Sequence, residues 1–100
     1  MISIPKHYKT ARPANKEEAS VIALNALTFI LSEDSLRLRF LDLTGLEGGD
    51  VRDRIADPRF LGAVLDFLMG HEPDLLAFAQ GQNLPPESAV HARHILMGGE

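Results

Sequence analysis

The segment from Pro58 to Met69 constrains the fold of this chain more than any other part of its sequence. Its large apolar side chains cover most of the circumference at helical spacing, and they are Phe60, Leu61, Val64, Leu65, Phe67, Leu68 and Met69. Only Arg59, Gly62 and Asp66 remain to form a narrow polar strip. A helix that is apolar around most of its girth is buried by neighbours on several sides. We therefore expect a central helix over residues 58–69.

Two residues within this segment need an explanation. Glycine in a helix interior costs about 1 kcal/mol relative to alanine, so we expect another backbone to pass close to Gly62. Asp66 either lies on the exposed strip or pairs with an arginine of a neighbouring helix. Acid–base catalysis by Asp66 would require a second titratable group beside it, and the sequence places none there.

Capping and turn signals predict five further helices, whereas strand patterns are almost absent. These helices cover residues 16–31, 33–44, 50–56, 73–80 and 86–97. Asn15 followed by Glu18 is an N-terminal capping pattern. Four glycines each follow a predicted helix and are expected to end it, namely Gly45, Gly70, Gly81 and Gly98. At Gly45 we expect the left-handed conformation that glycine adopts without steric cost.

These elements predict the fold class as all-α, a compact bundle of five to six short helices around the helix at 58–69. One hundred residues with 45% apolar and 24% charged side chains fit a single globular domain, which we place at residues 16–100. The first helix should be covered around most of its girth. Its narrow exposed strip is predicted to contain Glu17, Glu18, Val21, Asn25 and Thr28.

Composition also restricts the compartment and the chemistry. The chain has no cysteine, which excludes disulfides, thiolate metal sites and thiol nucleophiles, and we expect a cytoplasmic protein. The longest apolar run, Val21 to Leu31, falls short of the roughly 20 residues that cross a bilayer. Residues 1–15 lack the apolar core of a secretory signal. We expect no membrane partner and no cofactor.

The charge is distributed unevenly along the chain. Residues 1–16 carry Lys6, Lys9, Arg12 and Lys16 without any acid, whereas the remaining residues hold six basic and fourteen acidic side chains. We therefore expect residues 1–15 to form a flexible basic arm on an acidic body. Such an arm could bind nucleic acid, a membrane surface or its own domain.

Three stretches of sequence carry a family resemblance. They are ALNALTF at residues 23–29, RFLDLTGL at 39–46 and DPRFLGAVLDFL at 57–68, the last continued by Glu72 and by LLAFA at 75–79. Together they resemble the family known as domain of unknown function 3572, over roughly residues 17–97. The resemblance implies a compact helical cytoplasmic protein, mainly of alphaproteobacteria, and it implies neither an activity nor a catalytic residue.

Helix six carries one weak candidate for a metal site. Glu87, His91 and His94 fall at positions i, i+4 and i+7, and a carboxylate with two imidazoles suits Zn²⁺. This face lies opposite the apolar stripe of the same helix, so we expect it to be solvated and to hold no metal. Most of the carboxylates elsewhere in the chain stand in or just before a first helical turn, where capping explains them. We predict no catalytic residue.

DNA binding is the main alternative function. A helix-turn-helix near residues 36–56 would place Arg52 and Arg54 on the second helix, and the arm would contact phosphates through Lys6, Lys9 and Arg12. Against this interpretation, the second helix is short and acidic, and the body outside residues 1–16 carries a net charge of −8, six basic minus fourteen acidic residues. Such a body repels the phosphate backbone, so a nucleic-acid partner is disfavoured.

We therefore predict a non-enzymatic protein-interaction or small regulatory module of a bacterial cytoplasm. Its partner would be another protein or a second copy in a homodimer. Several apolar side chains exceed what six short helices are expected to bury, and they form the predicted interaction surface: Leu38, Leu41, Met69, Ile95 and Met97. A small enzyme or metal-binding protein remains the third interpretation.

Overall fold

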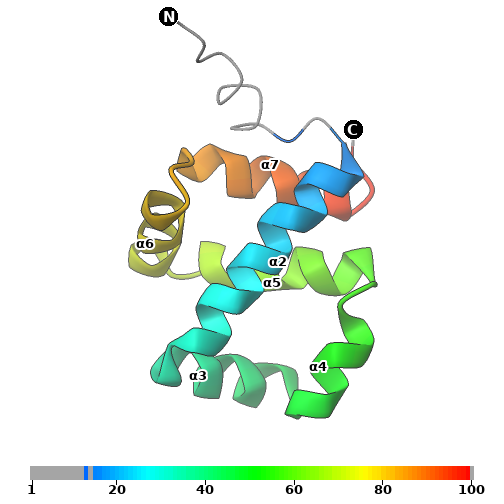
Figure 1. Cartoon of the computed structure of the whole chain (residues 1–100), viewed down its shortest axis with the longest axis vertical. Helices are drawn as coiled ribbons and strands as arrows, with labels where there is room; N and C mark the ends of the chain where they lie inside the picture. Colours follow the sequence, from blue (N-terminus) through cyan, green and yellow to red (C-terminus); the bar gives the residue numbers. More distant parts are fainter. Residues whose placement is uncertain (1–12, 14, 100) are drawn as a thin grey trace, which may run out of the picture.

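A computed structural model describes residues 13 and 15–99 of the chain, and within this range every regular element is a helix (Figure 1). The helices are α2 (Lys16–Ser32), α3 (Asp34–Thr44), α4 (Gly48–Arg54), α5 (Pro58–Met69), α6 (Glu72–Gly81) and α7 (Pro86–Leu96). The all-α prediction is confirmed. The predicted helix at 58–69 coincides with α5.

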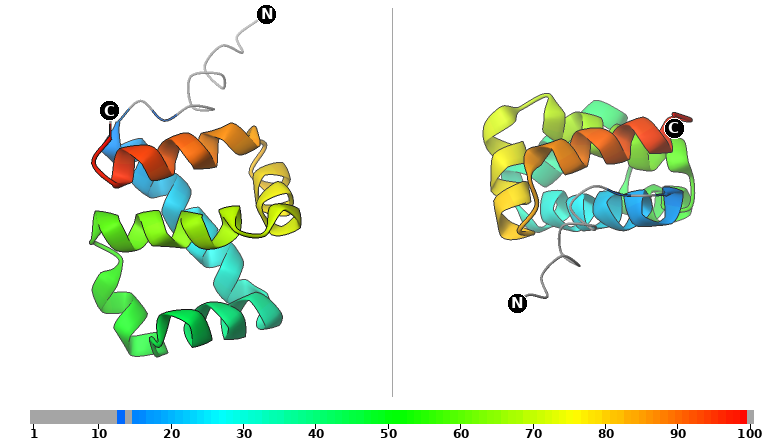
Figure 2. Two further views of the ribbon diagram at one scale, coloured as in Figure 1. Left: turned by 180° about the vertical axis from the view of Figure 1, so that it is seen from behind. Right: turned by 90° about the horizontal axis from the view of Figure 1, so that it is seen from above.

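Helix α5 lies at the centre of the packing, as its sequence predicts. It contacts α2 and α7, which also contact each other, so these three helices form the core. Helices α5 and α7 run side by side while α2 crosses them obliquely (Figures 1 and 2). The side chains of Val64, Leu65 and Leu68 are completely buried.

The outer helices are attached to this core through aromatic rings. The buried Phe40 of α3 packs edge-on against Phe60 and Phe67 of α5, with ring centroids 6.2 and 5.3 Å apart. Phe78 of α6 packs against Phe29 of α2, with ring centroids 5.8 Å apart. These pairs fix α3 and α6 at different edges of the three-helix core.

Predicted caps are present at both central helices. Asn15 accepts a hydrogen bond from the backbone N–H of Glu18 at 2.8 Å, and Asp57 accepts one from Arg59 N–H at 2.9 Å. Gly45 ends α3 in the left-handed region at φ +72°. Each residue satisfies a helix end that would otherwise leave backbone groups without partners.

Two boundary predictions are wrong. Helix α4 begins at Gly48 rather than Asp50, because Asp50 acts from inside the first turn and accepts the N–H of Glu47 at 3.1 Å. Gly81 belongs to α6, and the left-handed residue in the turn that follows is Asn83 at φ +56°. The prediction that Gly70 ends α5 is confirmed, and its φ of −75° lies in the ordinary right-handed region.

The predicted surroundings of Gly62 are also wrong. Gly62 is buried instead of lying on a polar strip, and its close neighbour is the side chain of Met97 rather than another backbone. Ala63 takes the exposed position beside it. The glycine therefore makes room for the end of α7.

The packed body begins before α2. Pro13, which the sequence assigns to the basic arm, is fully buried. Among the helices of the described range, none is long and apolar enough to span a membrane alone. Only α2 and α3 taken together meet those criteria, and they are bent by 111°.

Candidate functional site

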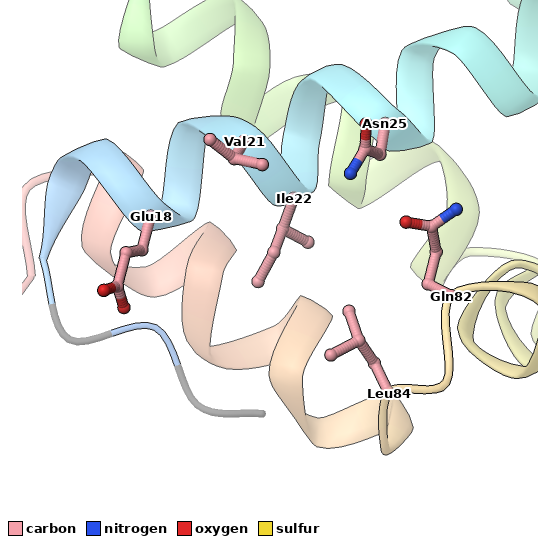
Figure 3. Close-up of a pocket in the computed structure, with 6 residues that line it drawn as sticks. All are labelled: Glu18, Val21, Ile22, Asn25, Gln82 and Leu84. Carbon is pink, nitrogen blue, oxygen red and sulfur yellow. The ribbon is translucent and has the colours of Figure 1, made fainter. Parts of the chain in front are cut away.

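A groove between α2 and the turn that joins α6 to α7 is a candidate site, and we call it the α2 groove. It has a volume of about 260 Å³. Its lining residues are Glu18, Val21, Ile22, Asn25, Gln82 and Leu84 (Figure 3). Small-molecule and cofactor sites typically occupy roughly 300–1,000 Å³. The smaller size of the α2 groove favours one or two side chains of a peptide over a cofactor.

The floor of the α2 groove is aliphatic. Ile22 projects from α2 and Leu84 from the turn, and their side chains approach each other across the floor (Figure 3). Ile22 is buried, whereas Val21 at the rim is 55% exposed. Helical spacing places Glu18, Val21 and Asn25 along one exposed face of α2, so the wall follows directly from the sequence of this helix.

The opposite wall depends on the conformation of the α6–α7 turn. Asn83 adopts φ +56°, which asparagine tolerates better than most residues. Leu84 then donates its backbone N–H to Ala79 O at 2.9 Å. This hydrogen bond holds the turn against α6 and presents Leu84 to α2.

Two amides stand at one end of the groove and a carboxylate at the other. The side chains of Asn25 and Gln82 face each other (Figure 3), and within the described range neither has a hydrogen-bond partner. Each amide offers both a donor and an acceptor. Glu18 supplies the carboxylate. The groove can therefore hold an aliphatic side chain while the amides bind the adjacent peptide group.

The predicted interaction surface does not exist as a single surface. Leu38 is 63% exposed, and Met97 is also exposed, but α3 and the end of α7 lie at opposite ends of the molecule (Figure 1). Leu41 and Met69 are partly buried against the core. Ile95 is only 8% exposed, so its assignment to the surface is wrong. Helix α7 packs against both α2 and α5, which widens its buried arc.

A second cleft, of about 320 Å³, is lined in part by the charged or titratable side chains of Arg39, Asp66 and His71. Asp74 accepts a hydrogen bond from Arg39 Nη2 at 3.3 Å, and its Oδ2 lies 2.5 Å from His71 Nδ1. The Arg39 guanidinium also stands 5.6 Å over the Phe67 ring. Arg39 and His71 thus converge on a carboxylate of the protein itself. We interpret this cluster as a tie between α3 and α6.

Asp66 pairs with Arg93 of α7, as one of the two sequence interpretations predicts. Arg93 Nη2 donates to Asp66 Oδ2 at 3.3 Å, and Nε lies 2.8 Å from Oδ1. Nε makes no hydrogen bond there, so one end of the guanidinium is imperfectly aligned. The pair links the core helices α5 and α7, which lie side by side and run in opposite directions (Figure 1).

The other sequence candidates do not assemble into a site. Glu87 and His94 are exposed, and no group of three potential ligands in the described part of the chain could hold a metal ion. In the predicted helix-turn-helix, Val51 is buried while Arg52 and Arg54 are exposed. The proposed nucleic-acid contacts Lys6, Lys9 and Arg12 lie outside the described residues.

The sequence predicts one exposed wall of the α2 groove, but it does not predict that this wall belongs to a site. Val21 was the only purely apolar residue in the predicted exposed strip of α2, and this irregularity is the signal that was available. Gln82 and Leu84 carried no comparable signal, because their position depends on the α6–α7 turn.

Comparison with known proteins identifies the family. A family model described as "Protein of unknown function (DUF3572)" matches residues 16–99, so the chain belongs to that family and the resemblance is confirmed. No curated protein and no solved structure matches the chain.

Proposed function

We propose that this member of the DUF3572 family is a docking module that binds a short peptide segment of another protein in the α2 groove. The observation that carries the proposal is the pairing of an aliphatic floor with two amides, Asn25 and Gln82, whose side chains have no hydrogen-bond partner among the described residues. An aliphatic anchor provides affinity through burial, and hydrogen bonds to the adjacent peptide group provide orientation. We place this function in the bacterial cytoplasm, an assignment supported by the absence of cysteine.

The lining residues favour binding over catalysis. Among the described residues that line the groove, Glu18 is the only titratable one. Acid–base chemistry in the groove would lack a second group to exchange protons with Glu18. An aliphatic floor offers neither a nucleophile nor a metal ligand.

The preferred peptide has a definable chemistry. A branched aliphatic side chain would pack on the floor that Ile22 and Leu84 form. Glu17 and Glu18 lie in the first turn of α2, so a basic residue next to the anchor is favoured. One small groove implies weak, reversible binding, because stable interfaces bury about 1,200–2,000 Å².

A displayed library of random linear 12-residue peptides tests this proposal. The full chain serves as bait, and the Val21→Asp variant measures the contribution of the groove. Val90→Asp is a matched control, because Val90 is 45% exposed on α7 and does not line the groove. Both substitutions add one charge at an exposed valine.

We expect the enriched peptides to share an aliphatic residue flanked by lysine or arginine. A synthetic consensus peptide should bind Val21→Asp at least tenfold more weakly than the unaltered chain in calorimetry, a loss of about 1.4 kcal/mol. Val90→Asp should bind within twofold of the unaltered chain. The proposal is wrong if no peptide is enriched, or if Val21→Asp binds the consensus peptide as well as Val90→Asp does.

A further inference from the structure

We infer that residues 1–12 of the same chain bind in the α2 groove and must be displaced by any partner peptide. The inference rests on the proposed function, since it names a first occupant for the same groove. Three properties support it: the point where these residues join the body, the order of their side chains, and their charge.

The point of attachment places these residues beside the groove. Pro13 is fully buried and Asn15 caps α2, so residues 1–12 join the body at the first turn of this helix. Glu18 begins the groove less than one turn from there (Figure 3). Ile22 lies about 10 Å along the helix from Asn15, at about 1.5 Å per helical residue. Twelve extended residues can span about 40 Å, which is ample.

The order of side chains matches the groove when the segment runs back along α2. The basic residues Lys6, Lys9 and Arg12 stand nearest to the point of attachment, and the aliphatic residues Ile2 and Ile4 stand farthest from it. The groove has the same polarity, because its acidic end is at the start of α2 and its aliphatic floor lies beyond. If the segment runs back along α2, its basic side chains lie beside the acidic end of the groove. Its isoleucines then lie on the aliphatic floor.

Charge strengthens this match. Residues 1–12 carry three basic side chains and no acid, whereas residues 17–100 hold six basic and fourteen acidic side chains. Opposite charge attracts the segment to the body in general, and Glu17 and Glu18 direct it to this end of α2. Attachment to the same chain also supplies a millimolar effective concentration, so weak contacts suffice.

Occupancy by the segment would regulate access to the groove. A segment that is bound nine-tenths of the time lowers the apparent affinity of a competing peptide about tenfold. Any event that removes the segment would raise the affinity for a partner by the same factor.

Paramagnetic NMR on the full chain tests the inference. The chain has no native cysteine, so Ser3→Cys accepts a single nitroxide label between the two isoleucines. We expect the label to broaden the resonances of Ile22, Asn25 and Leu84. Resonances of Leu38 in α3 and Asp53 in α4 should stay sharp, because these helices lie at the other end of the molecule (Figure 1).

Two further variants control for nonspecific attraction. Val21→Asp in the labelled chain should remove the broadening at the groove, and Val90→Asp should preserve it. Replacing Lys6, Lys9 and Arg12 with glutamine should weaken the broadening in the same spectra. Uniform broadening that ignores Val21→Asp would overturn the inference, as would broadening seen only between labelled and unlabelled copies in a mixture.

The result also separates this inference from the proposed function. Adding a library-selected peptide should restore the sharp groove resonances. If selected peptides bind while the nitroxide leaves the groove unaffected, the inference fails and the proposed function stands. If the nitroxide broadens the groove but the library yields no peptide, the inference stands and the proposed function fails.

Discussion

The side chain of Met97 occupies the space next to Gly62 that a Cβ atom would need. A Cβ built on Gly62 would lie 2.5 Å from Met97 Sδ and 3.0 Å from its Cγ. The residue just past α7 thereby packs directly against α5. Glycine at this position serves packing between two core helices, and its conformational freedom is not required.

Gly62→Ala should change stability by less than about 1 kcal/mol. The added methyl improves helix propensity by about 1 kcal/mol, but it displaces the Met97 side chain from the space next to residue 62. Met97 is flexible and exposed, so its thioether can move away at modest cost. In a Met97→Ala background, the same Gly62→Ala substitution should stabilise the protein by up to about 1 kcal/mol. Urea unfolding of the four chains measures this coupling.

A bulkier residue provides the control for this cycle. Gly62→Val should destabilise by about 1–3 kcal/mol, because a branched side chain overpacks the contact between α5 and α7. If Gly62→Ala lowered the free energy of unfolding by more than about 2 kcal/mol in both backgrounds, a group other than Met97 would have to crowd this position.

Ser88→Ala should stabilise the protein. Ser88 is fully buried in α7, and within the described range its hydroxyl has no hydrogen-bond partner. A buried polar group without a partner costs about 1–3 kcal/mol. Alanine removes that group and raises helix propensity, so we expect a gain of about 0.5–2 kcal/mol in urea unfolding. A loss of stability would reveal that the hydroxyl is hydrogen-bonded.

Asn15→Ala should cost about 1 kcal/mol through loss of the α2 cap. The side chain of Asn15 accepts the N–H of Glu18, whereas Glu33 at the same position of α3 makes no side-chain cap. Glu33→Ala is therefore a matched control, and we expect it to change the free energy of unfolding by less than about 0.3 kcal/mol. Equal effects of the two substitutions would show that the Asn15 hydrogen bond contributes nothing.

The central helix could be predicted from the sequence because its signals are local. Asp57 and Pro58 start α5, and the apolar side chains between Phe60 and Met69 cover most of its girth. Such signals act over one or two turns and do not depend on the rest of the fold. Both ends of α5 were predicted correctly for this reason.

Contacts between distant segments could not be predicted in the same way. Asp66 was expected to be exposed or to pair with an arginine, but six arginines follow residue 16 and only the docking of α7 selects Arg93. The α2 groove is a stronger example. Leu84 lies near Ile22 because Asn83 turns the chain back toward α2. No spacing pattern in the sequence predicts that these two residues lie close together.

Asp66→Asn should destabilise the protein by less than about 1 kcal/mol, although Asp66 interrupts the most apolar helix. The side chains of Asp66 and Arg93 are 44% and 38% exposed, so solvent screens their attraction. Exposed ion pairs contribute about 0–1 kcal/mol, and this contribution falls as salt rises. The effect should therefore be measurable by urea unfolding at low salt and vanish at 1 M NaCl. Phe40→Leu, which disturbs two ring contacts in the core, should retain its cost at both salt concentrations. A loss above 3 kcal/mol that persists in salt would mean that Asp66 has a structural role beyond the pair with Arg93.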